Sequence, residues 1–139
     1  MPTGIYARRI AWEKTKKLNI ISDLDAARLA MAIDCEGSIV NRATSHSKRP
    51  RWFGRETRIL IYNTDKQLLN WVSELTGLGK IRKHNNGKGA FLSQKITWVW
   101  DCSYLSAYQI IKRIYPWIIL KKEKAHQSIN WNSDYEEFQ

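Results

Sequence analysis

Cysteine and long apolar runs are scarce in this chain of 139 residues. The two cysteines, Cys35 and Cys102, lie far apart, which excludes a disulfide scaffold and a four-cysteine zinc finger. The longest uncharged apolar run, residues 114–120, is too short to cross a bilayer, and no signal-peptide pattern opens the chain. We therefore expect an intracellular protein, located in the cytoplasm or at the nucleoid, or in an organelle if the host is eukaryotic.

Acidic residues are also in the minority. There are 13 Asp and Glu residues against 23 Lys and Arg residues, which gives a formal net charge of +10. Such a surplus on a small domain favours a polyanionic partner, with nucleic acid first and an anionic membrane surface second. Hydrophobic residues make up 43% of the chain and include seven Trp, which excludes a disordered polycation. The length fits one folded domain, residues 1–139.

The positive charge is unevenly distributed. Residues 38–60 and 80–95 each carry a net charge of +5, and residues 1–21 carry +4. By contrast, residues 22–37 and residues 133–139 each carry −3. We interpret the first 21 residues as a basic N-terminal extension and the last seven as an acidic tail.

Capping residues and apolar periodicity predict the secondary structure. Helices are expected over 23–36, 64–77, 103–116 and 120–130, and strands over 37–45, 55–63, 79–84 and 95–101. This order favours an α+β fold in which a four-stranded antiparallel sheet carries its helices on one face. Both +5 segments fall on pairs of expected strands, so the other face of the sheet should be basic. Trp98 and Trp100 are expected in the core under the sheet.

Two acids, Asp34 and Glu36, end the first of these helices. A helix C-terminus carries partial negative charge, so carboxylates are unfavourable there. Two interpretations remain open at this point. The acids belong to a solvated helix end, or they bind a cation, because carboxylates and free helix-end carbonyls are the hard oxygen ligands that suit Mg²⁺.

Residues 29–37, Leu-Ala-Met-Ala-Ile-Asp-Cys-Glu-Gly, resemble the nine-residue signature of LAGLIDADG homing endonucleases. The first, second, fifth, sixth and ninth places match, and Glu36 keeps a carboxylate where the signature has its second Asp. The expected order of one motif helix followed by ββαββα is the domain plan of the family. Residues 115–121 are similar to a later family segment in which a helix ends at Pro and an essential Lys follows. The resemblance covers residues 22–127.

This resemblance implies an αββαββα fold with a saddle-shaped, four-stranded antiparallel sheet. It implies a site-specific homing endonuclease of the kind that takes part in intron homing. A single copy of the signature implies a homodimer that binds a long, near-palindromic DNA duplex and hydrolyses one phosphodiester in each strand. The implied cofactor is Mg²⁺, and Ca²⁺ is expected to bind without supporting cleavage. The expected partners are double-stranded DNA and a second copy of the chain, with no membrane and no small-molecule substrate.

The resemblance also implies the roles of individual residues at the end of the motif helix. Glu36 is the expected metal ligand, the backbone carbonyl of Cys35 is a second, and Asp34 is a possible third or else holds the helix end. Lys121 is expected to stabilise charge on the phosphate or to assist a water molecule. Asn63 is expected to position water. The catalytic residues are thus expected to be Glu36, Lys121 and Asn63.

DNA contacts are expected from the face of the sheet that carries no helix. The strand alternation selects Ser38, Val40, Arg42, Thr44, Arg58, Arg82, Lys95 and Thr97. Trp52 is the expected stacking residue. The basic residues of the N-terminal extension either form an arm that contacts the DNA backbone or belong to a frayed terminus; they are Arg8, Arg9, Lys14, Lys16 and Lys17.

The dimer contact is expected along the motif helix at Ala27, Ala30, Met31 and Cys35. Met31 occupies a place where the family usually has a small residue, so the contact is expected to be looser there or to shift toward Ala26 or Ala30. The main alternative in another functional class is a relative that binds nucleic acid without cleaving it, as an RNA-splicing maturase or a DNA-binding regulator. Retention of Glu36 and Lys121 favours the enzyme.

Overall fold

The computed structural model of the chain describes residues 4–43, 55–84 and 96–133. Its helices are α1 (Gly4–Lys14), α2 (Asp23–Glu36), α3 (Lys66–Thr76), α4 (Tyr104–Ile114), the short 3₁₀ helix η2 (Tyr115–Trp117) and α5 (Lys122–Trp131). Its strands are β1 (Gly37–Ala43), β2 (Arg55–Asn63), β3 (Lys80–His84) and β4 (Thr97–Ser103). The order of elements expected from the sequence is confirmed from α2 onward. In addition, the basic extension contains a helix, α1.

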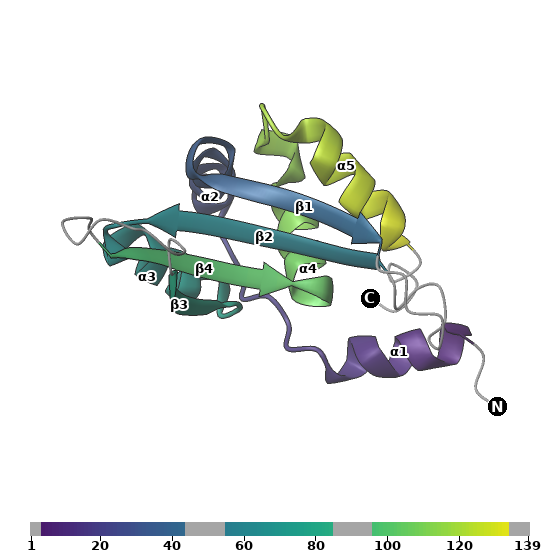
Figure 1. The fold of residues 1–139 in the computed structure, drawn as a ribbon. Helices are drawn as coiled ribbons and strands as arrows, with labels where there is room; N and C mark the ends of the chain where they lie inside the picture. Colours follow the sequence, from purple (N-terminus) through teal and green to yellow (C-terminus); the bar gives the residue numbers. More distant parts are fainter. Residues whose placement is uncertain (1–3, 44–54, 85–95, 134–139) are drawn as a thin grey trace.

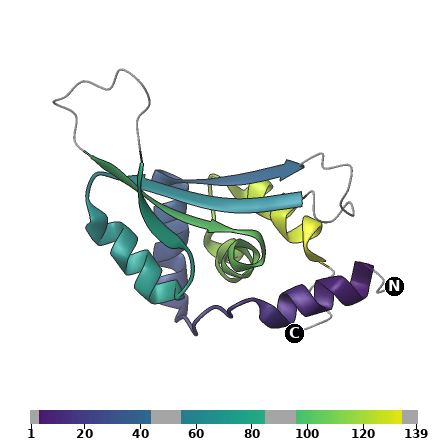
Figure 2. The ribbon, with the colours of Figure 1, turned by 60° about the horizontal axis from the view of Figure 1, so that its bottom comes forward.

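The four strands form one antiparallel sheet in the order β1-β2-β4-β3. Figure 1 looks onto the face of this sheet that carries no helix, and Figure 2 shows α2, α3, α4 and α5 gathered on the opposite side. The expected α+β architecture, with helices on one face of the sheet, is therefore confirmed.

The helix-covered face of the sheet holds the core. Ile39 of β1 pairs with Ile59 of β2, and Ile61 of β2 pairs with Trp100 of β4; all four side chains are completely buried. Trp98 is partly buried against the same core cluster, so both tryptophans lie under the sheet as expected. Alternation along each strand then directs the intervening side chains to the open face.

Helix α2 begins where the sequence predicts, at a capping serine. The hydroxyl of Ser22 accepts a hydrogen bond from the backbone N–H of Asp25 at 3.1 Å. Ala26, Leu29, Ala30 and Ile33 recur at helical spacing and are completely buried. This face fixes α2 against the sheet and leaves its last residue, Glu36, at the start of β1.

The N-terminal extension packs on the body of the protein. Trp12 forms a small cluster with Leu105 and Tyr108 of α4, and the backbone N–H of Leu18 donates to the side chain of Gln109 at 2.9 Å. The alternative of a frayed terminus therefore does not hold for this part of the extension. Within the described segments, no helix has the length and apolar character needed to span a bilayer.

Candidate functional site

The C-terminal end of α2 is joined to the segment that precedes α5. Asp34 is only 3% exposed. Its carboxylate accepts three backbone N–H groups, from Ile119 at 2.7 Å, from Leu120 at 3.1 Å and from Lys121 at 3.1 Å. The ammonium of Lys121 donates in turn to the backbone carbonyl of Asp34 at 2.5 Å. The side chain of Lys121 is thus fixed at the end of the motif helix.

These contacts do not suit the possible role of Asp34 as a metal ligand. Both of its carboxylate oxygens accept backbone N–H groups, and the side chain is buried. A carboxylate at a helix C-terminus is unfavourable by itself, and three N–H donors offset that cost. Asp34 is therefore placed to hold two segments together, the other role expected for it.

Glu36 differs from Asp34 in its exposure to solvent and in its hydrogen bonding, the two properties that decide whether a carboxylate is available to a metal ion. It is exposed, and its carboxylate has no hydrogen bond or ion pair with any part of the chain that the structure describes. The next residue, Gly37, lies so close to neighbouring backbone that an added Cβ would be 3.0 Å from the carbonyl oxygens of Ile33 and Leu60. Only a glycine fits this junction without displacing backbone, so the chain turns directly from Glu36 into the sheet.

The donor set at this helix end fits a hard divalent cation only in part. Glu36 offers a carboxylate, and within the described segments nothing donates to the Cys35 carbonyl. In the same segments, no cluster of three or more His, Cys, Asp and Glu side chains is found. Mg²⁺ commonly takes one or two carboxylates and completes its shell with water and substrate phosphate. A divalent ion bound at this helix end would therefore need further oxygens from outside the chain.

Asn63 lies at the end of β2, and its side chain takes part in the following turn. Its Oδ1 accepts the backbone N–H of Asp65 at 2.9 Å, and the Asp65 carboxylate accepts the N–H of Gln67 at 2.8 Å, which caps α3. Within the described residues, no hydrogen bond joins the side chain of Asn63 to Glu36 or Lys121. Its expected role in positioning water stays a prediction.

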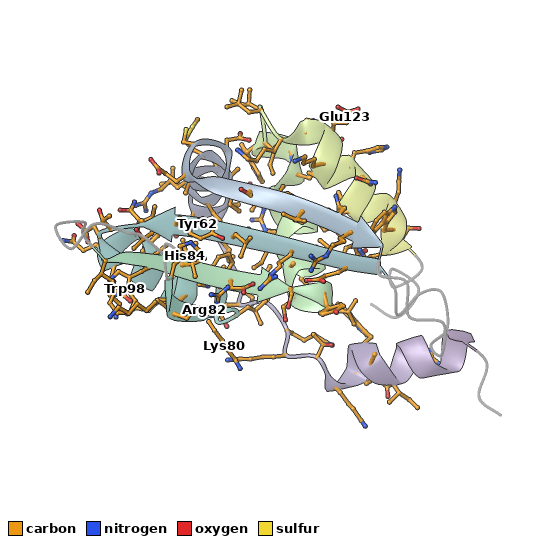
Figure 3. All side chains as sticks on the ribbon, in the orientation of Figure 1. Tyr62, Lys80, Arg82, His84, Trp98 and Glu123 are labelled. Atoms are coloured by element: carbon orange, nitrogen blue, oxygen red, sulfur yellow. The ribbon has the colours of Figure 1, made fainter. Side chains whose placement is uncertain are left out.

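The open face of the sheet carries the expected DNA-binding residues that the structure describes. Pairing across β1 and β2 puts Ser38, Val40 and Arg42 on the same face as Arg58. Pairing across β4 and β3 puts Thr97 and Arg82 there as well. Figure 3 views this face and labels Tyr62, Arg82 and His84 on β2 and β3. The other expected contacts, Thr44, Lys95 and Trp52, lie outside the described residues.

Two acids on the open face, Glu56 and Asp101, were not among the expected site residues. Arg42 pairs with Glu56 at 3.1 Å, and Arg82 pairs with Asp101 at 3.2 Å. Arg58 forms a bidentate pair with Asp101 and lies 3.9 Å from Glu56. Hydrogen bonds from Arg58, with a smaller contribution from Arg82, hold the pKa of Asp101 below its usual value, and the same pair raises the pKa of Arg58.

The face of α2 that points away from the core is exposed and mostly apolar, with the 58% exposed side chain of Arg28 among its apolar residues. Leu24 is 71% exposed and Met31 is 49% exposed, and beside the helix end Ile119 and Leu120 are 67% and 74% exposed. Cys35 is also exposed, with its sulfur 3.5 Å from that of Met31.

This exposed face contains most, but not all, of the residues expected at a dimer contact. Ala27 is partly exposed, but Ala30 is completely buried within its own chain. Ala26 is completely buried too. The expectation that the contact shifts toward Ala26 or Ala30 is therefore wrong, because both residues belong to the face that packs on the sheet.

The fold of this chain is similar to that of solved structures. No protein-family model matches the chain, and no curated protein does. Solved structures do match. The homing endonuclease I-CvuI, in complex with its target in the presence of Ca, is 18% identical with a TM-score of 0.61; the match covers 78% of this chain and 65% of that one. The group I intron-encoded homing endonuclease I-CeuI, complexed with DNA, is 16% identical with a TM-score of 0.58, over 97% of this chain and 66% of that one.

A third matching structure is described as a LAGLIDADG homing endonuclease. The I-SmaMI LAGLIDADG homing endonuclease, bound to cleaved DNA, is 20% identical with a TM-score of 0.54, over 85% of this chain and 37% of that one. This chain thus spans less than two thirds of the length of the structures that it matches. It has the fold of LAGLIDADG homing endonucleases, as the signature at residues 29–37 predicts.

Proposed function

We propose that this chain is a site-specific DNA endonuclease of the LAGLIDADG homing type, which acts as a homodimer and hydrolyses one phosphodiester in each strand of a long, near-palindromic duplex with Mg²⁺. One observation carries the proposal. The Lys121 ammonium is held at the Asp34 carbonyl, and Glu36, whose carboxylate has no partner among the described residues, ends the same helix where the chain enters a sheet whose open face displays arginines. The neighbours I-CvuI, I-CeuI and I-SmaMI support it, since each was solved with its DNA.

The chemistry needs a negatively charged phosphate to be held beside an anionic helix end. Glu36 and the Cys35 carbonyl would hold the divalent ion, which when bound lowers the pKa of water and polarises the phosphate. The ammonium of Lys121, held 2.5 Å from the Asp34 carbonyl, would offset negative charge on the phosphate as the bond breaks. Asp34 keeps this ammonium at the helix end through the three backbone N–H groups of residues 119–121.

A second copy of the chain is the occupant that best fits the exposed face of α2. Duplex DNA has two strands to cut, and one chain brings one Glu36. A twofold contact along α2 would cover Leu24 and Met31 and bring the two Glu36 side chains near each other. Repulsion between the two carboxylates would be relieved by bound cations.

The decisive experiment uses the full chain and a plasmid library with randomised inserts. Wild-type protein with Mg²⁺ is expected to linearise only plasmids that carry its site, EDTA is expected to stop cleavage, and Ca²⁺ is expected to allow binding alone. Glu36→Gln is expected to lower the cleavage rate by more than about 100-fold while binding to the selected site is kept. Glu123→Gln is the matched control, because it removes an exposed carboxylate from α5. Selective binding without cleavage at any divalent ion would refute the enzyme and leave a DNA-binding protein.

A further inference from the structure

Five charged residues form a continuous row across the open face of the sheet. We define this arginine–carboxylate row as Arg42 on β1, Glu56 and Arg58 on β2, Asp101 on β4 and Arg82 on β3. Each residue is within 4 Å of the next, from Arg42–Glu56 at 3.1 Å, through Arg58–Glu56 at 3.9 Å and the Arg58–Asp101 pair, to Arg82–Asp101 at 3.2 Å. All four strands contribute to the row, and Figure 1 looks onto the face where it lies.

The two carboxylates lie low in this row, and the outer arginines stand above them. The side chains of Glu56 and Asp101 are 11% and 15% exposed. Those of Arg42 and Arg82 are 58% and 50% exposed. The acids are therefore shielded from solvent by the arginines, whose outer edges face any molecule that docks on the sheet.

Arg58, at the centre, is the most constrained of the three arginines, because Asp101 takes a whole edge of its guanidinium. Its Nε donates to Asp101 at 2.9 Å, its Nη2 donates to the other oxygen of the same carboxylate, and its Nη1 faces Glu56. Reading guanine in the major groove takes two N–H groups from one edge of the guanidinium. Arg58 thus bridges the two acids and keeps one edge of its guanidinium, and its expected DNA contact stays a prediction.

Arg42 and Arg82 are each held by fewer hydrogen bonds than Arg58. Within the described residues, each gives only Nη2 to a carboxylate, Arg42 to Glu56 and Arg82 to Asp101. Each keeps N–H groups that can meet the two acceptors of guanine. Arg82 and Asp101 also line a hollow of about 340 Å³ beside β3, which is open to solvent.

The row adds little to general attraction for DNA, because three arginines and two carboxylates leave a net charge of only +1. Carboxylates on a DNA-facing surface repel phosphate, so they lower binding to any sequence. A carboxylate that fixes a long arginine side chain restricts where that arginine can donate, which matters for reading bases and not for neutralising phosphates. In DNA binding, the effect expected of Glu56 and Asp101 is therefore on selectivity and not on general affinity.

We propose that Glu56 and Asp101 are specificity-determining positioning residues: Glu56 orients Arg42, and Asp101 orients Arg82, to read guanine at two separate base pairs of each half-site. This inference rests on the proposed function. Arg42 and Arg82 lie on the two edge strands, about 14 Å apart across the sheet and about 20 Å apart along it, whereas base pairs are spaced by about 3.4 Å. The two arginines therefore meet different base pairs.

The test is selection of bound duplexes from a randomised DNA library, with Ca²⁺ in place of Mg²⁺, followed by sequencing. Wild type is expected to enrich a site with fixed guanines. Glu56→Gln is expected to weaken the preference about tenfold at the base pair that Arg42→Lys also affects, and Asp101→Asn at the base pair that Arg82→Lys also affects. Lys80→Gln, on the same face but outside the row, is expected to weaken binding to every sequence alike.

The readout is that each acid variant and its paired arginine variant lose preference at the same base pair. A purely structural role of the acids would not produce this result. If the acid variants select the wild-type site unchanged, or lose preference uniformly along it, the inference is overturned. The lysine variants keep the charge of the arginines, so the map of base pairs is obtained even if an acid variant unfolds, and a lysine variant that affects no base pair overturns the inference by itself. A wild-type protein that enriches no sequence would refute the proposed function, which is a different result from an enriched site that ignores Glu56 and Asp101.

Discussion

Lys121 donates two hydrogen bonds to Asp34, one from its backbone and one from its side chain. The backbone N–H of Lys121 donates to the Asp34 carboxylate at 3.1 Å, and the ammonium of Lys121 donates to the Asp34 carbonyl at 2.5 Å. The two residues are 87 positions apart in the sequence. A single buried aspartate thus ties the end of the motif helix to the segment that carries the proposed catalytic lysine.

Asp34→Asn is expected to lower both stability and cleavage. The amide keeps one acceptor oxygen but turns an NH₂ group toward backbone N–H donors, so charge-assisted hydrogen bonds are lost at a cost of about 2 kcal/mol in the free energy of unfolding. Lys121 loses its fixed position, and the cleavage rate should fall at least about tenfold in protein that is still folded. Chemical unfolding and single-turnover cleavage measure the two effects.

Asp25→Asn is the matched control for this change. Asp25 is in the first turn of the same helix, and its pair with Arg28 at 3.0 Å is largely exposed. Such a pair contributes less than about 0.5 kcal/mol, so stability and cleavage should both stay near wild type. An Asp34→Asn variant that cleaves at the wild-type rate would show that the hydrogen bonds of the Asp34 carboxylate do not position Lys121.

Gly37→Ala is expected to disturb the site by crowding backbone. The new Cβ would be 3.0 Å from the carbonyl oxygens of Ile33 and Leu60, which belong to α2 and β2 and cannot rotate away. The expected cost is about 1–3 kcal/mol in the free energy of unfolding, together with a loss of cleavage because Glu36 is the adjacent residue.

Gly77→Ala separates these two effects. Gly77 ends α3 with a φ of 69°, so alanine is strained there and should cost about 1 kcal/mol. The residue lies at the end of a different helix from Glu36, so cleavage by the folded fraction should be unchanged. If both glycine variants are less stable than wild type and their folded fractions cleave at the same rate, the junction at Gly37 contributes to folding and not to cleavage.

Met31→Asp is expected to convert the proposed dimer into monomers without unfolding the chain. Met31 is 49% exposed in the single chain, so a charge there costs little until a partner covers it. Sedimentation equilibrium should show dissociation at concentrations where wild type is dimeric, and double-strand cleavage should be lost. Tyr104→Asp, at a residue that is 52% exposed at the start of α4, is the control expected to remain dimeric. A wild-type monomer that cuts both strands would refute the dimer.

The two cysteines allow the same interface to be followed by thiol modification. Cys35 is exposed on the apolar face of α2, whereas Cys102 is buried and burial raises the pKa of its thiol to about 12. A thiol reagent at neutral pH should therefore modify Cys35 alone. Modification of Cys35 should slow as wild-type protein is concentrated, and it should stay fast at every concentration in Met31→Asp. A rate that is independent of concentration in wild type would place the contact elsewhere.

Local patterns were sufficient to predict the elements that form this site. Ser22 and the apolar spacing of α2 predict the helix, and alternation predicts which face of β1 holds Arg42. Ala30 was misplaced because small residues occur on both faces of α2, and only packing decides which of them is buried. The acids of the arginine–carboxylate row were missed because Asp101 meets Arg58 across 43 positions of sequence. A near-neighbour signal did exist, since Glu56 and Arg58 stand two residues apart and therefore share one face of a strand.

The pH dependence of stability provides an independent check on the arginine–carboxylate row. Hydrogen bonds from Arg58 lower the pKa of Asp101 in the folded protein. A carboxyl group with a lowered folded pKa stabilises the fold above its unfolded pKa, near 3.9, and loses this contribution as the pH falls through the folded value. Wild type should therefore exceed Asp101→Asn by about 1 kcal/mol at pH 7, or about 4 °C in Tm, with the gap closing below about pH 4.

Comparing the two proteins at each pH cancels the titration of every other carboxyl group that they share. Glu74→Gln, which changes an exposed acid on α3, should follow wild type across the whole range. Calorimetric Tm values between about pH 2.5 and pH 7 measure the gap. A gap that persists unchanged at the lowest pH would mean that the ion pair with Arg58 does not stabilise the fold, and that asparagine disturbs the sheet through its shape alone.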